Sequence, residues 1–158
     1  LYFVADPKET EKIKKQDDLT DAFIKTAAAE TFLSWHYYKS KKDDAEKILK
    51  QGEVPPEFLR SMFYTYGDYR DICLDTDISA KPRGSHVKNA TDNIGKFISK
   101  FGRGNGLTRE NWWKKHGPKI WEGMLCALPG TANFQNKEDY KDPPEDFAKQ
   151  PQFLRWLT

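Results

Sequence analysis

Six basic side chains lie close together in the middle of this sequence, and they could bind a polyanion through their charge. They are Lys81, Arg83, Lys88, Lys96, Lys100 and Arg103. The wider segment 79–120 holds ten Lys or Arg residues against Asp92 and Glu110, a net charge of +8, whereas the whole chain carries +2. Clustered cations attract nucleic acid, anionic lipid or sulfated glycan. The alternative is that these charges only keep a surface loop solvated.

Residues that would support catalysis or metal binding show no matching pattern. The sequence has neither a GxSxG nor an HExxH motif, and it has no cluster of Cys and His at zinc-ligand spacing. Asp68, Asp71, Asp75 and Asp77 do not fit a calcium loop, which also requires a glycine and a terminal Glu. We therefore expect no enzyme, no metal site and no cofactor, and we interpret these aspartates as a helix end followed by a solvated loop.

The two cysteines, Cys73 and Cys126, are the remaining reactive side chains. An isolated pair forms one disulfide in an oxidising compartment or stays as two buried thiols in a reducing one. Each lies at the end of a predicted long helix, and a disulfide between them would close a loop of about fifty residues. These residues alone leave both alternatives open.

The segment 111–128 is the predicted centre of the core. It holds three of the five tryptophans, and Trp113, Ile120, Met124 and Leu128 fall near one face of a helix at spacings of seven, four and four. The Gly117-Pro118 pair interrupts this pattern, because proline removes a helical hydrogen bond and clashes with the preceding turn. We expect a kink there, or two abutting helices.

Apolar residues recur at spacings of three and four in several other segments. They predict helices at 20–42, 57–74 and 94–101, and a last helix that begins near Pro151. Asp75, Pro82 and Gly84 predict a loop over 75–91. Long β-like alternations are absent, so we predict an all-α helical bundle of about five helices with long loops.

Both ends of the chain look cut, which indicates a fragment of a larger protein. Residues 1–19 are predicted to be a strap or the end of a preceding subdomain, with a short strand or extended segment at 1–4. Residues 20–158 are the predicted bundle. No apolar run is long enough to span a membrane, and no signal peptide opens the chain.

Four stretches resemble the Duffy-binding-like domain of malarial adhesins, especially the variant erythrocyte membrane protein 1 family. They are AFIKTAAAETFLSWHYYKSK (22–41), PPEFLRSMFYTYGDYRDICLDTDIS (55–79), NWWKKHGPKIWEGMLCAL (111–128) and PQFLRWLT (151–158). The stretches occur in the family's order and cover nearly half the chain. They are most similar to the ε- or X-type domains of the variant that binds chondroitin sulfate in placenta.

The resemblance implies a disulfide-stapled all-α adhesin module that corresponds mainly to the family's second subdomain, with variable loops at 42–53, 80–108 and 129–149. It favours a Cys73–Cys126 disulfide over free thiols. It also implies adhesion of infected erythrocytes to a host cell-surface receptor, contact with neighbouring domains of the same adhesin, and a place on the infected cell's outer face. Catalysis, a nucleic-acid partner and membrane insertion are not implied for this segment.

Receptor residues differ between members of this family, so the binding site is predicted from charge alone. We assign it to the six basic residues from Lys81 to Arg103, with a sulfated glycosaminoglycan such as chondroitin sulfate as the expected ligand. Two alternatives remain: a scaffold segment with no ligand of its own, and an intracellular helical domain that binds nucleic acid through the same charges.

Overall fold

The computed structural model describes residues 1–157, and every regular element within them is a helix, which confirms the predicted all-α class. The elements in chain order are α1 (Tyr2–Ala5), α2 (Pro7–Thr10), α3 (Gln16–Lys41), α4 (Ala45–Lys50), α5 (Pro56–Leu74), α6 (His86–Phe101), α7 (Arg109–Cys126), the 3-10 turn η1 (Thr131–Asn133), α8 (Glu145–Lys149) and α9 (Gln152–Leu157). None of these helices is long and apolar enough to cross a membrane.

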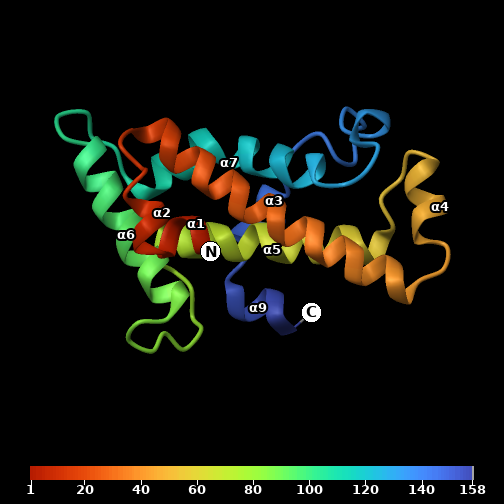
Figure 1. The fold of residues 1–158 in the computed structure, drawn as a ribbon, viewed down its shortest axis with the longest axis horizontal. Helices are drawn as coiled ribbons and strands as arrows, with labels where there is room; N and C mark the ends of the chain where they lie inside the picture. Colours follow the sequence, from red (N-terminus) through yellow and green to blue (C-terminus); the bar gives the residue numbers. More distant parts are fainter. Residues whose placement is uncertain (158) are drawn as a thin grey trace.

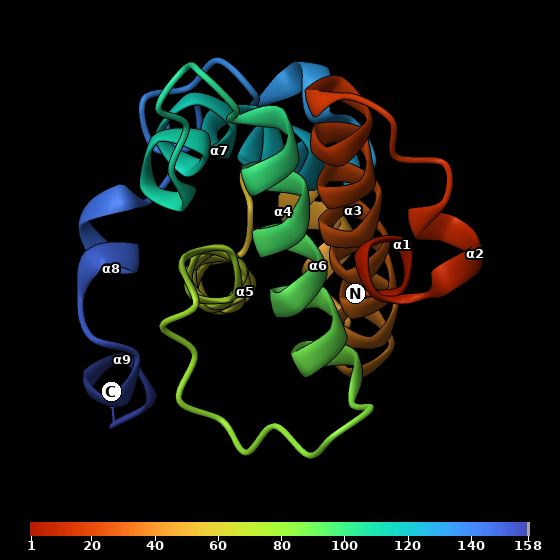
Figure 2. The same ribbon diagram turned by 90° about the vertical axis from the view of Figure 1, so that its left-hand side faces the viewer.

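Three long helices, α3, α5 and α7, run along the long axis of the molecule (Figure 1). Among all pairs of elements, α3 and α7 pack together most extensively, and α5 contacts both. Helix α6 crosses one end of this bundle and α4 lies at the other, while α8 and α9 lie along one side (Figure 2). The bundle therefore has two distant ends, each closed by a shorter helix.

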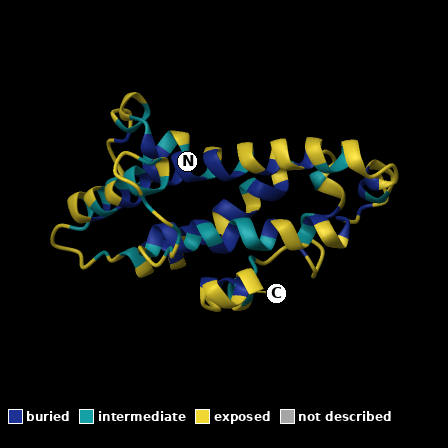
Figure 3. Ribbon diagram, turned by 90° about the horizontal axis from the view of Figure 1, so that it is seen from below, coloured by how far each residue is buried: buried dark blue, intermediate teal, exposed yellow. Residues whose placement is uncertain are grey.

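The core is built largely from aromatic side chains. Trp35, Trp112 and Trp121 are at most 1% exposed, and the ring of Phe23 on α3 lies 5.0 Å from that of Trp112. Buried apolar side chains lie on the inward faces of α3, α5 and α7, while the outward faces of these helices are exposed (Figure 3). Such rings bury a large apolar area per residue, which suits a chain with few aliphatic residues.

Helix α7 confirms the predicted core segment. Thr108 caps it, its side chain accepting a hydrogen bond from the Asn111 backbone N–H at 3.1 Å, and Trp113, Ile120 and Met124 are all buried. Of the two alternatives expected at Gly117-Pro118, two abutting helices are wrong, because α7 continues through Pro118, and a kink remains a prediction. Pro118 lies on the exposed side, so the Lys114 carbonyl that loses its helical donor can be hydrated.

Helix α6 is longer than expected. It begins at His86, so residues 86–91, predicted as loop, are helical. The Ser85 side chain accepts from the Lys88 backbone N–H at 3.1 Å, which is the N-cap that the sequence prediction missed. Ala90, Thr91, Ile94 and Ile98 form its buried face.

The N-terminal segment is helical as well, so the prediction of a strand or extended segment at 1–4 is wrong. Val4 in α1 is fully buried against the bundle, and the Asn93 side chain on α6 donates to its carbonyl at 3.1 Å. Helix α3 also begins earlier than predicted, at Gln16. The division of the chain at residue 19 remains a prediction.

The last helix begins where predicted, but its inner face is polar. Gln152 and Arg155 are buried, whereas its four apolar residues Phe153, Leu154, Trp156 and Leu157 are exposed. Arg155 forms an ion pair with Asp71 on α5 and a second, at 3.4 Å, with Asp68. The prediction that Asp68 and Asp71 belong to a solvated helix end is therefore wrong, because both pair with Arg155 and hold α9 onto α5.

Candidate ligand-binding surface

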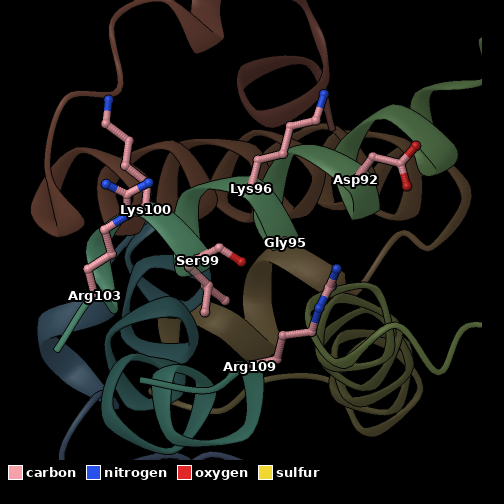
Figure 4. Close-up of a pocket in the computed structure, with 8 residues that line it drawn as sticks. Asp92, Gly95, Lys96, Ser99, Lys100, Arg103 and Arg109 are labelled. Atoms are coloured by element: carbon pink, nitrogen blue, oxygen red, sulfur yellow. The ribbon is translucent and has the colours of Figure 1, made fainter. Parts of the chain in front are cut away.

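Helix α6 presents a basic face at one end of the bundle. Residues 92, 96, 99, 100 and 103 repeat at spacings of four, three, one and three, which places them on one side of the helix and its end. Lys96, Lys100 and Arg103 surround an open hollow of about 730 Å³, and Ser99 lies between them (Figure 4). Helix α6 and the turn after it thus bring together half of the six predicted cations.

The charges around this hollow are predominantly positive. Within residues 1–157, Lys96, Lys100 and Arg103 have no carboxylate within ion-pair distance, although Lys100 Nζ lies 6.0 Å from the Phe101 ring centroid. Asp92, the one acidic residue of the lining, is paired with Lys88 at 3.1 Å. An anion in this hollow would therefore meet three exposed cations and one carboxylate that is already partly neutralised.

The other three predicted site residues are not part of the hollow. Lys81 binds the Asp77 backbone carbonyl at 2.6 Å and lies 3.9 Å from the Asp77 carboxylate. Lys88 is held by Asp92, one turn further along α6. Arg83 is exposed in the loop before α6. Lys81 and Lys88 are therefore engaged within the chain.

Arg109, which was not among the predicted site residues, also lines the hollow. Its guanidinium donates to the Cys73 carbonyl at 3.0 Å and to the Thr91 carbonyl at 3.1 Å, so it joins α5, α6 and α7. A side chain at Gly95 would overlap this guanidinium, which explains a glycine in the middle of a helix. In the sequence, a glycine inside a helix indicates a close contact at that position, but it does not identify Arg109 as the contacting residue.

The predicted disulfide is wrong for this structure, in which Cys73 and Cys126 are both free. Cys73 is the last residue but one of α5 and lies beside the start of α7, with its Sγ 3.8 Å from the Arg109 carbonyl oxygen. Cys126 is the last residue of α7, so the length of that helix, about 25 Å, separates it from Cys73. A disulfide requires Cα atoms within about 7 Å. Burial raises the pKa of the Cys73 thiol to about 12, so this thiol stays protonated.

A second group of polar side chains joins α8 to the bundle. The Glu145 carboxylate accepts hydrogen bonds from the Tyr66 hydroxyl and from Trp113 Nε1, the latter at 3.2 Å. Burial, followed by the nearby Glu145, raises the pKa of Tyr66, so its hydroxyl remains a donor. Within residues 1–157, no group of three or more His, Cys, Asp or Glu side chains is arranged to hold a metal ion.

The family model of the Duffy binding domain matches residues 4–155, which is nearly the whole chain. No curated protein matched the chain, and no solved structure did. Duffy binding domains are receptor-binding adhesion modules rather than enzymes, and they are typically extracellular. With its all-α fold and its match over residues 4–155, this chain belongs to the Duffy binding domain family.

Proposed function

We propose that this chain is part of a cell-surface adhesin that binds a host receptor, a sulfated glycosaminoglycan such as chondroitin sulfate, in the α6 hollow. The observation that carries the proposal is the convergence of Lys96, Lys100 and Arg103 around one open hollow, opposed only by Asp92. Sulfates and carboxylates of a glycan would bind these cations by charge-assisted hydrogen bonds. Ser99 offers a hydroxyl donor in the middle of the same face.

The hollow suits an extended polyanion better than a compact ligand. It is open to solvent, and its cations extend from Lys96 and Lys100 on one face of α6 to Arg103 just beyond the end of the helix. An extended glycan chain could lie along such a face and place successive anionic groups near successive cations. The fixed guanidinium of Arg109 adds positive potential beneath it, although two of its N–H groups are already used.

The proposal also places the chain in the variant erythrocyte membrane protein 1 group, on the surface of infected erythrocytes. Its support is the set of four stretches at 22–41, 55–79, 111–128 and 151–158, which occur in the order typical of that group. The assignment to an ε- or X-type domain of the placental variant belongs to the same proposal. Residues 1–19 would then be a strap or the end of the preceding subdomain.

Retention on immobilised chondroitin sulfate tests the site. The variant K96Q/K100Q/R103Q removes the three cations of the hollow, and it should elute at clearly lower salt than the unaltered protein. The matched control is K114Q/K115Q/K119Q, which removes three exposed lysines of α7 from the same basic segment. Equal losses in the two variants would mean that overall charge, and not the hollow, retains the protein.

The main alternative is a scaffold segment that binds no ligand itself. It is favoured by Lys81 and Lys88, since these predicted cations are occupied by intrachain partners. A folded protein that is retained on neither chondroitin sulfate nor heparin would support that alternative. A nucleic-acid-binding domain would use the same cations, but the receptor-binding character of the family argues against it.

A further inference from the structure

A second pocket lies at the end of the bundle opposite α6, between α3, α4 and the turn after α7. Its volume is about 390 Å³, which is within the usual range for a small-molecule site. It is lined by Trp35, Glu46, Leu49, Lys50, Pro129, Gly130 and Asn133. Its surface is mainly apolar, in contrast to the open and charged hollow at α6.

Trp35 supplies an aromatic wall of this pocket. Its ring is fixed from other sides by Tyr38, with ring centroids 5.9 Å apart, and by Phe58, at 5.2 Å. The side chain is 1% exposed, and its Nε1 has no hydrogen-bond partner within residues 1–157. A buried indole N–H without an acceptor is unfavourable, so packing against its two aromatic neighbours, and not a hydrogen bond, holds the ring at the pocket.

The pocket lining carries one acidic and one basic side chain, Glu46 and Lys50. Glu46 is paired with Lys39 at 3.2 Å, which partly offsets its charge. Lys50 is exposed at the mouth and has no carboxylate within ion-pair distance in residues 1–157. The remaining polar group of the lining, the Asn133 amide, is neutral. The free charge at the rim therefore favours an anionic ligand.

We propose that this pocket binds a small organic anion with an apolar body. The body, an aromatic ring or a branched aliphatic chain, would pack on Trp35, Leu49 and Pro129. The acidic group would pair with Lys50 Nζ at the exposed edge of the lining. A sulfated glycan has no such apolar body, so this site and the α6 hollow take different ligands.

Titration with 8-anilinonaphthalene-1-sulfonate, which has an apolar ring system and one sulfonate, tests the inference. The variant K50Q should bind this probe roughly tenfold more weakly, the effect of losing one charge-assisted hydrogen bond. K47Q is the matched control, because Lys47 is also exposed on α4 but does not line the pocket. An affinity that falls equally in K50Q and K47Q, or in neither, would overturn the assignment.

Two further measurements locate the probe. The variant N133W places an indole at the exposed mouth and should abolish binding, whereas K96Q/K100Q/R103Q should leave it unchanged. In a spectrum that resolves the indole N–H groups, the signal lost in W35F should be the one that the probe shifts most. Methanesulfonate, which has the acidic group alone, should not shift it. A probe that shifts other indoles and spares Trp35 would place the site elsewhere.

Discussion

Arg155 shows how a single buried charge can fix the position of a helix. It is fully buried, it forms an ion pair with Asp71, and it also donates to the Ala148 carbonyl at 3.0 Å. Gly67 on α5 makes room for it, since a side chain there would overlap the guanidinium. The pair therefore determines how α9 docks on α5, although a buried pair is weak evidence for net stability.

Breaking this pair should be costly. In D71A the Arg155 charge stays buried without its main partner, and we expect unfolding to become easier by about 3–5 kcal/mol, measured by urea denaturation. D68A is the control and should cost under about 1 kcal/mol, because the Asp68 side chain is 41% exposed. The double variant D71A/R155M should recover most of the loss. A D71A protein as stable as the D68A protein would refute this account.

His116 should make stability depend on pH. It is buried between α3 and α7, and its Nδ1 lies 3.1 Å from the Thr20 hydroxyl. Burial, and then the nearby Lys115 and Lys119, lowers its pKa below the ordinary value of 6.5. As pH falls, His116 is therefore protonated at a higher pH in the unfolded chain than in the folded protein. The contribution of His116 to stability is fully present above about pH 6.5. It is lost as pH falls from there through the lower pKa that His116 has in the folded state.

The variant H116Q should remove that part of the pH dependence. Thermal unfolding between pH 7.5 and 5 should show a smaller drop in melting temperature for H116Q than for the unaltered protein. H36Q is the control, because His36 is exposed on α3 and should leave the drop unchanged. Identical pH profiles for H116Q and the unaltered protein would contradict the role assigned to His116.

The directions of the helices decide the chemistry of the two cysteines. Both end a long helix, but the C-terminal end of α5 lies beside the N-terminal end of α7, so the two thiols are a helix length apart. A protein that keeps both thiols should react with iodoacetamide at the exposed Cys126 while folded, and at the buried Cys73 only in urea. Mass spectrometry counts the labels. A folded protein that takes up no label until reductant is added would show that a disulfide forms after all.

The helices themselves could be predicted from sequence because each has a regular apolar face. Trp113, Ile120 and Met124 in α7, and Phe58, Met62 and Tyr66 in α5, are buried as their spacing indicates. The start of α6 could not be predicted this way, because its first turns rest on the Ser85 cap and on Ala90 and Thr91, which carry little apolar signal. Periodicity reports which face is buried, and it does not report caps.

The relative directions of the helices and the partners of the charged residues also could not be predicted from the sequence. The antiparallel arrangement that separates Cys73 from Cys126 is a tertiary feature, as is the pairing of Asp71 with Arg155, 84 positions apart. The site was predicted in outline, since the basic segment was identified. Which cations remain free depends on neighbours such as Asp77 and Asp92, which close on Lys81 and Lys88 only in the folded chain.

The whole molecule separates two surfaces of different chemistry at its two ends. One end carries the open basic hollow of α6 (Figure 4), and the other end, where Figure 1 shows α4, carries the mainly apolar pocket. The three long helices between them form an aromatic core that holds both ends in place. An adhesion module needs such a rigid support, because binding loses less entropy when the site is already formed.

The central claim is that three cations of the α6 hollow contact the glycan, and the salt dependence of binding counts them. The dissociation constant for chondroitin sulfate should be measured across a range of sodium chloride concentrations for the unaltered protein and for K96Q/K100Q/R103Q. If each cation releases about one counterion on binding, the slope of log affinity against log salt should become shallower by roughly two to three in the triple variant. An unchanged slope would show that these residues do not contact the glycan.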